Sequence, residues 1–507
     1  MNSAFLRSLL VYAVVLPLAV LIGWMLTSPF NTESLTVVGA VVFVLLLPII
    51  LKFHYGLMVF SWNASMTVFF LPGQPTFCAL MIVINLAMAV GYRVLQRRPL
   101  FIHVPMLTFS WLALALVVLV TAKIRGGVGM RALGGSSYGG RQYFYVLVGI
   151  LGYFALATRS INFNKLIQFT KSFYLSGVTA VISSLIYYLP SLWILYLIFP
   201  VSGASGQAMA DYFGLEMSRI GSLALAGTAV THYLLARYGL RGVFNLRVPW
   251  RLMIYVAAII LAALSGYRSS FIALVFLSAV LFAVEGLVFS RWFFVSLLAG
   301  GLVLAAIIPI AQKLPLSLQR TLSILPITVD PVARYDADGS VEWRILMWKA
   351  MIPDLPKYFW LGKGYAINPT DMYLAEHAHR AGFAPPFEGA IVSGDYHSGP
   401  LSLYIPFGLP GVLAFFAMLI TGARALWLNY KFGDNRLRIL NRFFLAMFVS
   451  KALFFFAIFG SLPSDTIVFA GIVGASVALN RGVCRKPSLA HGTIGAADTL
   501  GLSPSPA

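Results

Sequence analysis

Charged residues are scarce in this chain, and acidic residues are the scarcest of them. Of 507 residues, 10% are charged and 60% are hydrophobic, and only 16 are Asp or Glu against 36 Lys or Arg. Soluble globular domains carry about 25% charged residues, so the composition excludes an ordinary soluble enzyme. It predicts an all-α polytopic integral membrane protein.

Cysteine is nearly absent as well, and its placement excludes a disulfide-stabilised fold. Cys78 lies in a long apolar run and Cys484 in a basic segment near the C-terminus. We predict intramembrane and cytoplasmic positions for them, so no disulfide is expected. The sequence also has no P-loop and no Rossmann glycine pattern for binding a nucleotide.

Long apolar runs, by contrast, are abundant. A helix that crosses the hydrocarbon core needs about 20 apolar residues. Only Arg7 precedes the first run and no small-residue cleavage site follows it, so we interpret that run as a retained helix. We expect about fourteen spans, near residues 8–26, 36–52, 55–72, 76–94, 104–122, 142–158, 172–199, 221–238, 252–265, 270–287, 292–312, 397–420, 443–461 and 465–480.

Basic residues produce the formal net charge of +20. They gather after the fourth, eighth, twelfth and last expected spans, as the positive-inside rule predicts for cytoplasmic loops. This pattern argues against nucleic acid as a partner and favours the membrane bilayer. The residues are Arg93, Arg97, Arg98, Arg237, Arg241, Arg247, Arg251, Lys431, Arg436, Arg438, Arg442, Arg481, Arg485 and Lys486.

Alternation of the spans predicts four parts. Residues 1–312 would hold N-terminal transmembrane helices, 313–396 a large loop, 397–480 the C-terminal transmembrane helices, and 481–507 a disordered tail rich in Ser, Gly, Ala and Pro. Both termini are then expected in the cytoplasm. In a bacterial inner membrane, the 313–396 loop would be periplasmic.

The 313–396 loop is the polar part of the chain, because nine of the 16 acidic residues lie there. Within it, residues 341–351 place large apolar side chains at helical spacing, and the run ends before Pro353. This pattern predicts an amphipathic helix at the outer membrane surface, where Arg344 and Trp348 share one face. The loop's aromatic residues could bind a sugar or a lipid chain, or simply anchor the loop at the interface.

Two arginine-bearing segments are candidates for binding an anion. Arg268 lies in a tight turn between two apolar spans, where a charge is costly unless it snorkels, pairs or binds something. Residues 123–141 place Arg125 and Arg141 among many glycines, whose N–H groups can approach an anion closely. The span count places this second segment on the outer side of the membrane, where the positive-inside rule disfavours basic residues. The alternative explanation is that the rule is statistical and tolerates these residues locally.

The histidines offer a candidate base and a weak candidate metal site. His397 is flanked by Asp395 where the chain re-enters apolar sequence, which suits a proton acceptor beside an anionic site; a structural histidine is the alternative. Glu376, His377 and His379 match no zinc spacing, so no metal is predicted.

Lys451 lies in the middle of an expected span. A charge at that depth must face a polar interior, and Asp465 is a conceivable partner for it. A structural role and a functional role are both open for this residue.

A series of residues in the 313–396 loop and in the span after it resembles, in its order along the chain, the paired motifs of the O-antigen ligase and O-antigen polymerase superfamily. The architecture is also similar, with a dozen or so helices and a histidine where a large late loop rejoins the membrane. The chain departs at Ser398, where the family usually has Asn, and at Phe359, where a proline is common. The motif residues are Arg344, Trp348, Gly362, Gly364, His397, Leu401, Gly408, Leu409, Pro410 and Gly411.

The resemblance implies a glycosyltransferase that moves a glycan from a polyprenyl diphosphate carrier to the hydroxyl of a lipid or glycan acceptor, without a metal or other cofactor. It assigns His397 as the base, with Arg344 and Arg268 stabilising the diphosphate. A lipid-linked donor also suits the periplasm, which has no ready pool of nucleotide sugars. The candidate substrate-binding residues are Arg141, Arg125, Trp348 and Asp395.

Two alternative functions remain. A repeat-unit polymerase of the same superfamily would share every motif. A transporter or flippase for lipid-linked glycan would also need many helices and a cationic cavity, but it would be expected to carry charges along its spans and broken helices in matched halves. Here the polar groups gather at one face instead.

Overall fold

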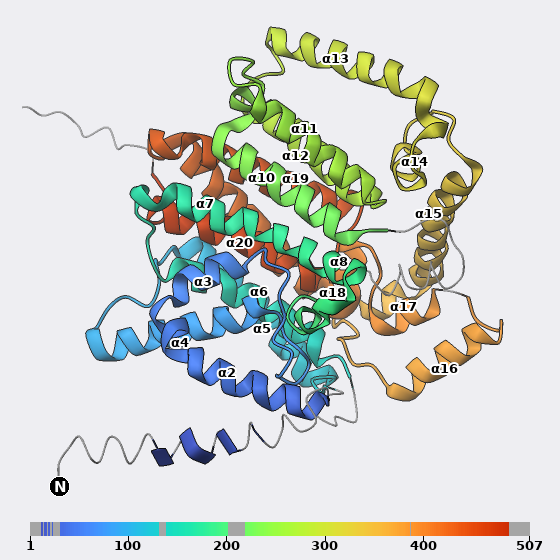
Figure 1. Cartoon of the computed structure of the whole chain (residues 1–507). Helices are drawn as coiled ribbons and strands as arrows, with labels where there is room; N and C mark the ends of the chain where they lie inside the picture. The colour runs from blue at the N-terminus through green and yellow to red at the C-terminus, as the bar shows by residue number, and fades with distance from the viewer. Residues whose placement is uncertain are drawn as a thin grey trace, which may run out of the picture.

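A computed structural model describes residues 12–13, 15–17, 19–20, 23, 31–130, 138–200, 219–385 and 387–485. These residues are mostly helical and contain no strand, with only isolated bridges between Thr67 and Thr76 and between Tyr138 and Ile367. Figure 1 shows the helices stacked side by side in a bundle. The predicted all-α polytopic membrane fold is confirmed.

Eight helical runs in the described part of the chain are long and apolar enough to cross a membrane. Seven are single helices: α2 (Thr32–Lys52), α4 (Phe77–Gln96), α5 (Pro105–Arg125), α13 (Arg291–Ile307, which continues into a 3-10 turn), α18 (Gly399–Phe432), α19 (Arg438–Ala457) and α20 (Leu462–Asn480). The eighth run is broken, and joins α7 (Leu166–Leu175) to α8 (Ala180–Tyr188) through a 3-10 turn.

Four further helices occupy expected spans. They are α6 (Gly140–Ala157), α10 (Gly221–Val243), α11 (Trp250–Leu264) and α12 (Arg268–Val284). The expected span 8–26 lies largely outside the described residues, as do the 200–218 loop and most of the 481–507 tail.

The structure corrects two expected spans. The run at 55–72 forms only the short helix α3 (His54–Ser61), because polar residues follow it and bond to another helix: the Asn63 side chain donates to the Phe173 carbonyl at 2.6 Å. The run at 172–199 is divided, and Pro190, which cannot continue an α-helix, opens a 3-10 segment, Pro190–Leu197.

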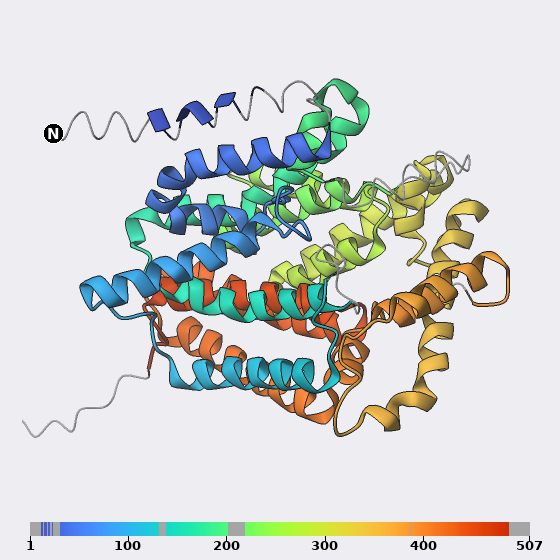
Figure 2. The same ribbon diagram turned by 90° about the horizontal axis from the view of Figure 1, so that it is seen from below.

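Helix α20 lies at the centre of the bundle, with most of its residues buried. It packs along α6, while α10 packs along α11, α12 along α19, and α5 along α18. Figure 2 shows these helices from below, in several layers. Helix α13, in contrast, has no buried residue.

The 313–396 segment forms a helical cap at one end of the bundle, on the right in Figure 1. Its α-helices are α14 (Leu316–Leu322), α15 (Pro331–Met351), α16 (Pro369–Arg380) and α17 (Glu388–Ser393). Helix α15 begins ten residues before the expected helix, because the Asp330 carboxylate accepts the Val332 N–H and Pro331 occupies the first turn. It ends at Met351, where the sequence predicted.

A small core holds this cap on the bundle. Its buried members are Met347 and Met351 from α15, Phe387 before α17, and Tyr396 and Ile405 on either side of the start of α18. Trp343 and Trp348 pack against it. This core therefore joins the cap to the point where the chain re-enters the bundle.

The motif glycines bring two backbone segments into direct contact. The N–H groups of Lys363 and Gly364 donate to the carbonyls of Ile405 and Pro406, at 2.7 and 3.0 Å. A Cβ added to Gly362 would lie 2.1 Å from the Pro406 carbonyl, and Gly408 has a φ of +59° inside α18. Side chains at Gly362 and Gly408 are excluded for packing reasons, and the contact fixes the cap against α18.

Candidate functional site

Four arginines meet at the cap end of the bundle, and we call Arg219, Arg268, Arg320 and Arg344 the arginine cluster. Asp336 on α15 pairs with two of them, Arg219 and Arg320. Arg219 Nη2 donates to both oxygens of Asp336 at 2.9 Å, and Arg320 Nε donates to the same carboxylate. Burial alone would raise the pKa of Asp336, but the hydrogen bonds and charges of Arg320 and Arg219 outweigh it, so its pKa is lowered.

Arg320 ties three segments together. Besides Asp336, its guanidinium donates to the Gly266 carbonyl and, at 3.1 Å, to the Ser340 hydroxyl. Gly266 belongs to the turn before α12, where Arg268 lies, and Ser340 is one helical turn before Arg344. Because Arg320 is 4% exposed, it fixes these segments from inside the protein.

Arg268 is the first residue of α12 and donates to the Ala337 carbonyl of α15. This bond and the Arg320 contacts bring Arg268 close enough to Arg344 for their charges to interact. Arg344 lies on the same face of α15 as Asp336 and Ser340, at steps of four residues.

The Arg344 guanidinium makes no hydrogen bond or ion pair with any described residue. Its Cζ lies 5.7 Å from the centre of the Phe459 ring. Burial and the positive charges of Arg320 and Arg219 lower the pKa of Arg344, and Asp395 opposes them. An arginine remains charged under these conditions, so this site carries positive charge with donors free to bind an anion.

His397 lies just before α18, in the left-handed backbone region with a φ of +49°. Its ring packs against Trp343 and Phe459, with ring centres 5.3 and 5.4 Å away. Nε2 lies 3.7 Å from an Asp395 carboxylate oxygen, and the buried Nδ1 has no hydrogen-bond partner among the described residues. A non-glycine residue in this conformation is uncommon and often marks a functional position.

Burial lowers the pKa of His397, with a further lowering by the charge of Arg344 and a partial compensation by Asp395. The imidazole is therefore neutral at pH 7 and can accept a proton. Because Arg344 contributes to the shift, the candidate base and the candidate anion ligand are electrostatically linked.

Trp348 bonds to the backbone directly before this histidine. Its indole N–H donates to the Tyr396 carbonyl at 2.9 Å, directly before His397. Asp395 remains half exposed. Trp348 and Asp395 thus both act next to His397. Trp348 holds the backbone before it, and Asp395 acts on it through its charge.

Within the described residues, Arg125 and Arg141 contact groups outside the arginine cluster. Arg125 donates from Nε to the Gly362 carbonyl at 2.8 Å and from Nη2 to the Leu361 carbonyl at 3.0 Å, so it supports the glycine motif. Arg141, exposed in the first turn of α6, lies over the Tyr145 ring at 5.7 Å. Arg131, from the same glycine-rich segment, lies outside the described residues.

Sequence reasoning missed Arg219, Arg320 and Phe459. The available signal for Arg320 was a single charged residue in a short helix that also carries three leucines, Leu316–Leu322. Phe459 gave no signal, because it is one phenylalanine in an aromatic-rich stretch.

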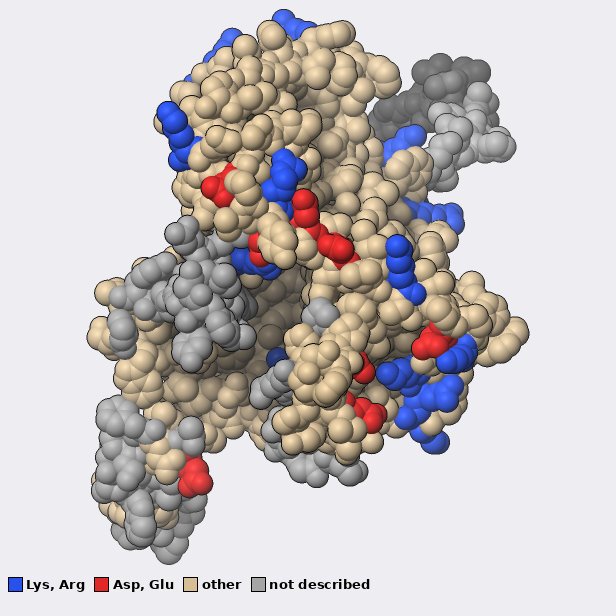
Figure 3. Space-filling model, turned by 90° about the vertical axis from the view of Figure 1, so that its right-hand side faces the viewer, with Lys and Arg blue, Asp and Glu red and all other residues tan. Residues whose placement is uncertain are grey.

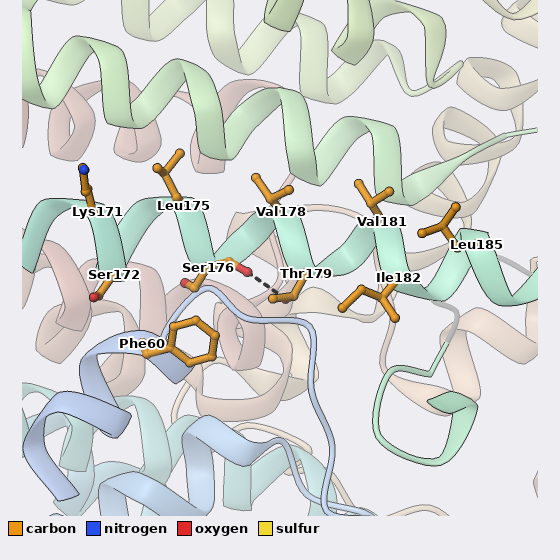
Figure 4. A pocket seen from close by; sticks show the side chains of 10 residues that line it. All are labelled: Phe60, Lys171, Ser172, Leu175, Ser176, Val178, Thr179, Val181, Ile182 and Leu185. Atoms are coloured by element: carbon orange, nitrogen blue, oxygen red, sulfur yellow. Dashed lines mark hydrogen bonds between the residues drawn. The ribbon is translucent and has the colours of Figure 1, made fainter. Parts of the chain in front are cut away.

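The cap end of the bundle is hollowed. Figure 3 shows this face, with a depression near its centre and both basic and acidic side chains at the border. Figure 4 shows a different feature, a groove of about 520 Å³ along α7 and α8 that contains none of the cluster residues. Its lining is mainly apolar, with Val178, Val181 and Ile182 alongside Ser176 and Thr179.

No group of three or more His, Cys, Asp or Glu comes together within the described residues in a way that could hold a metal ion. His377 packs on Tyr373 with ring centres 4.0 Å apart. The predicted Lys451–Asp465 pair is confirmed, with Nζ and Oδ1 2.6 Å apart.

The segment that carries most of these residues matches a known family. Residues 253–416 match a family model described as O-antigen ligase, and this segment contains Arg268, Arg320, Arg344 and His397. No curated protein matches the chain significantly. The match over this segment supports the superfamily predicted from the motifs. It implies glycosyltransferase-type activity on lipid-linked glycans, and with the apolar helices it identifies a multi-pass bacterial membrane protein.

Proposed function

We propose that this protein of the O-antigen ligase and polymerase superfamily transfers a glycan from a polyprenyl diphosphate carrier to an acceptor hydroxyl. The observation that carries the proposal is the pairing of His397 with Arg344. One side chain is a neutral, half-buried imidazole, and the other is a guanidinium with no hydrogen bond among the described residues. They are linked through the Phe459 ring and through their charges.

The reaction needs a base on one side of the anomeric carbon and cations on the other. The acceptor oxygen forms a bond to the anomeric carbon while the bond from that carbon to the diphosphate oxygen breaks. The hydroxyl proton passes to Nε2 of His397, and polyprenyl diphosphate leaves with the electron pair of the broken bond. Arg344 and Arg268 stabilise the charge that develops on the diphosphate.

Arginine suits stabilisation of the leaving diphosphate better than lysine, because its planar guanidinium group matches two phosphate oxygens at once. Each charge-assisted hydrogen bond contributes about 1.5–3 kcal/mol. The arrangement of Arg268 and Arg344 is fixed before the donor binds, since Arg320 and Asp336 hold both segments. A preorganised cationic site pays little reorganisation cost as negative charge appears.

The membrane orientation follows from the basic loops. With both termini cytoplasmic in a bacterial inner membrane, the 313–396 cap and the arginine cluster would face the periplasm. A finished lipid-linked glycan would meet its acceptor there. The residues 1–312 and 397–480 would form the two transmembrane parts around the cap.

The glycan pool of the native host tests the function and separates its two forms. In cells whose only copy carries His397→Ala, glycans left on polyprenyl diphosphate should accumulate relative to wild type. Long chains would identify a ligase, and single repeat units a polymerase. An unchanged pool, at normal membrane levels of the variant, would contradict the catalytic role of His397 and favour a transport function.

A further inference from the structure

The turn between α19 and α20 forms a wall of the catalytic site, although it lies beyond the segment that matches the family. Its residue Phe459 contacts His397, with ring centres 5.4 Å apart, and Arg344, whose Cζ is 5.7 Å from the ring centre. Those two residues come from different elements, the start of α18 and the middle of α15. A single half-buried ring therefore touches both groups that the reaction requires.

An aromatic ring is well suited to hold Arg344. A carboxylate in the same place would occupy the guanidinium donors and compete with a phosphate. The face of a phenyl ring attracts the cation through its quadrupole but accepts none of its N–H groups in a strong hydrogen bond. Phe459 thus restrains the guanidinium and leaves its donors available.

The same ring packs against His397, as the Trp343 ring also does. Covering the imidazole reduces its contact with water, which disfavours its protonated form. Phe459 therefore contributes to the burial that keeps this histidine neutral. Its removal would expose the ring and raise its pKa toward the ordinary value.

An ion pair within the bundle fixes the turn. One oxygen of Asp465 accepts the Ser461 N–H at 3.0 Å, and the other pairs with Lys451 Nζ at 2.6 Å. The Asp465 side chain is 7% exposed and that of Lys451 22%. Charges that are so little exposed are retained only with a well-placed partner, so the pair holds Ser461 firmly in place.

Contacts with the start of α18 complete the restraint. The Leu462 N–H donates to the Ser402 hydroxyl at 3.1 Å. A Cβ on Gly460 would lie 2.7 Å from the Gly399 Cα, so the turn and the residues after His397 touch through their backbones. The turn is thereby tied to the same segment that carries the histidine.

We infer that Phe459 is a positioning residue that orients Arg344 and shields His397, and that the Lys451–Asp465 pair acts by holding the turn that carries it. This inference rests on the proposed function. It also gives a role to Lys451, the charge in the middle of a membrane span.

The test measures glycan transfer and its pH profile with purified full-length protein in proteoliposomes containing a polyprenyl-diphosphate-linked glycan and an acceptor. Phe459→Leu retains an apolar side chain but removes the ring. We expect kcat to fall by roughly ten- to thirtyfold and the acid limb of the profile to move to higher pH. Phe459→Tyr, which keeps the ring, should restore both, and Lys451→Met should reproduce the shift of the acid limb.

Phe416→Ala is the matched control, because that half-exposed ring stacks on Phe456 within the bundle and touches no site residue. It should leave the rate and the profile unchanged. A wild-type rate and profile for Phe459→Leu, while His397→Ala is inactive in the same assay, would overturn this inference alone. Full activity of His397→Ala would instead overturn the proposed function. An unchanged pH profile for Lys451→Met would show that the Lys451–Asp465 pair is not needed to hold Phe459 in place.

Discussion

At the scale of single residues, the proposed role of His397 as the base makes its protonation the determinant of the pH dependence of transfer. Burial sets its pKa below the ordinary value of 6.5, and Asp395 partly offsets this effect. A base must be neutral, so the rate should be constant around pH 7 and fall as the pH drops through the lowered pKa. The acid limb of the profile should therefore lie below pH 6.5.

Asp395→Asn directly tests the opposing effects of burial and of the Asp395 charge on the pKa of His397. Within the described residues, Asp395 is the group that raises the pKa of His397, so removing its carboxylate should move the acid limb to lower pH. Asp371→Asn, in the first turn of α16 of the same cap, is the control and should leave the limb in place. A movement of the limb to higher pH in Asp395→Asn would show that Asp395 acts in another way.

Arg344→Lys keeps the charge of the site but removes the planar guanidinium group that can bind two phosphate oxygens at once. Because one charge-assisted bond contributes about 1.5–3 kcal/mol, we expect the transfer rate to fall by about 10- to 100-fold. Arg334→Lys is the matched control on the same helix, since Arg334 makes a single bond to the Ile327 carbonyl at 2.7 Å, which a lysine can replace. Equal rates for the two variants would contradict a bidentate role for Arg344.

At the scale of elements, the site depends on how α14 holds α15 against the turn before α12. Arg320→Met keeps the length of the side chain but removes its bonds to Asp336, Gly266 and Ser340. Asp336 is one-third exposed and keeps Arg219 as a partner, so the protein should still fold with a loss of at most a few kcal/mol. Transfer should fall by about tenfold or more, because Arg268 and Arg344 lose their common support.

The control for that experiment is the melting temperature of the purified variant. A variant that is folded at the assay temperature and inactive supports the positioning role. A folded variant with wild-type transfer would show that α15 is held without Arg320.

Helices with a clear period were predictable from the sequence, whereas contacts between distant segments were not. The face shared by Arg344 and Trp348 follows from helical spacing alone, and so does the end of α15 near Pro353. Arg320 and Phe459 reach the site only through packing among α12, α14, α15 and the turn before α20. No local pattern records such packing.

The same limit applies to the glycines and to Arg125. The motif predicted that Gly362 matters, but only the structure shows that the Pro406 carbonyl occupies the place of a side chain there. For Arg125, the sequence could not reveal that its donors bind the carbonyls of Leu361 and Gly362. Spacing indicates which residues can share a face, and it does not indicate which donors are already used.

At the scale of the whole molecule, polarity is separated along the bundle. In the described part of the chain, the arginine cluster, the candidate base and their supporting acids lie at the cap end, whereas the bundle interior is mainly apolar. Lys451 and Asp465 are charges within the spans, and they neutralise each other. This separation favours chemistry at one membrane face over movement of a charged substrate through the bundle.

In the proposed function, this protein itself breaks the bond between glycan and diphosphate with His397 as the base. The most direct measurement is the release of polyprenyl diphosphate by purified protein in proteoliposomes supplied with a lipid-linked glycan and an acceptor. Wild type should release one polyprenyl diphosphate for each glycan transferred, and His397→Ala should release almost none while still binding the donor. Equal release by the two proteins, or transfer of glycan without release, would contradict the account.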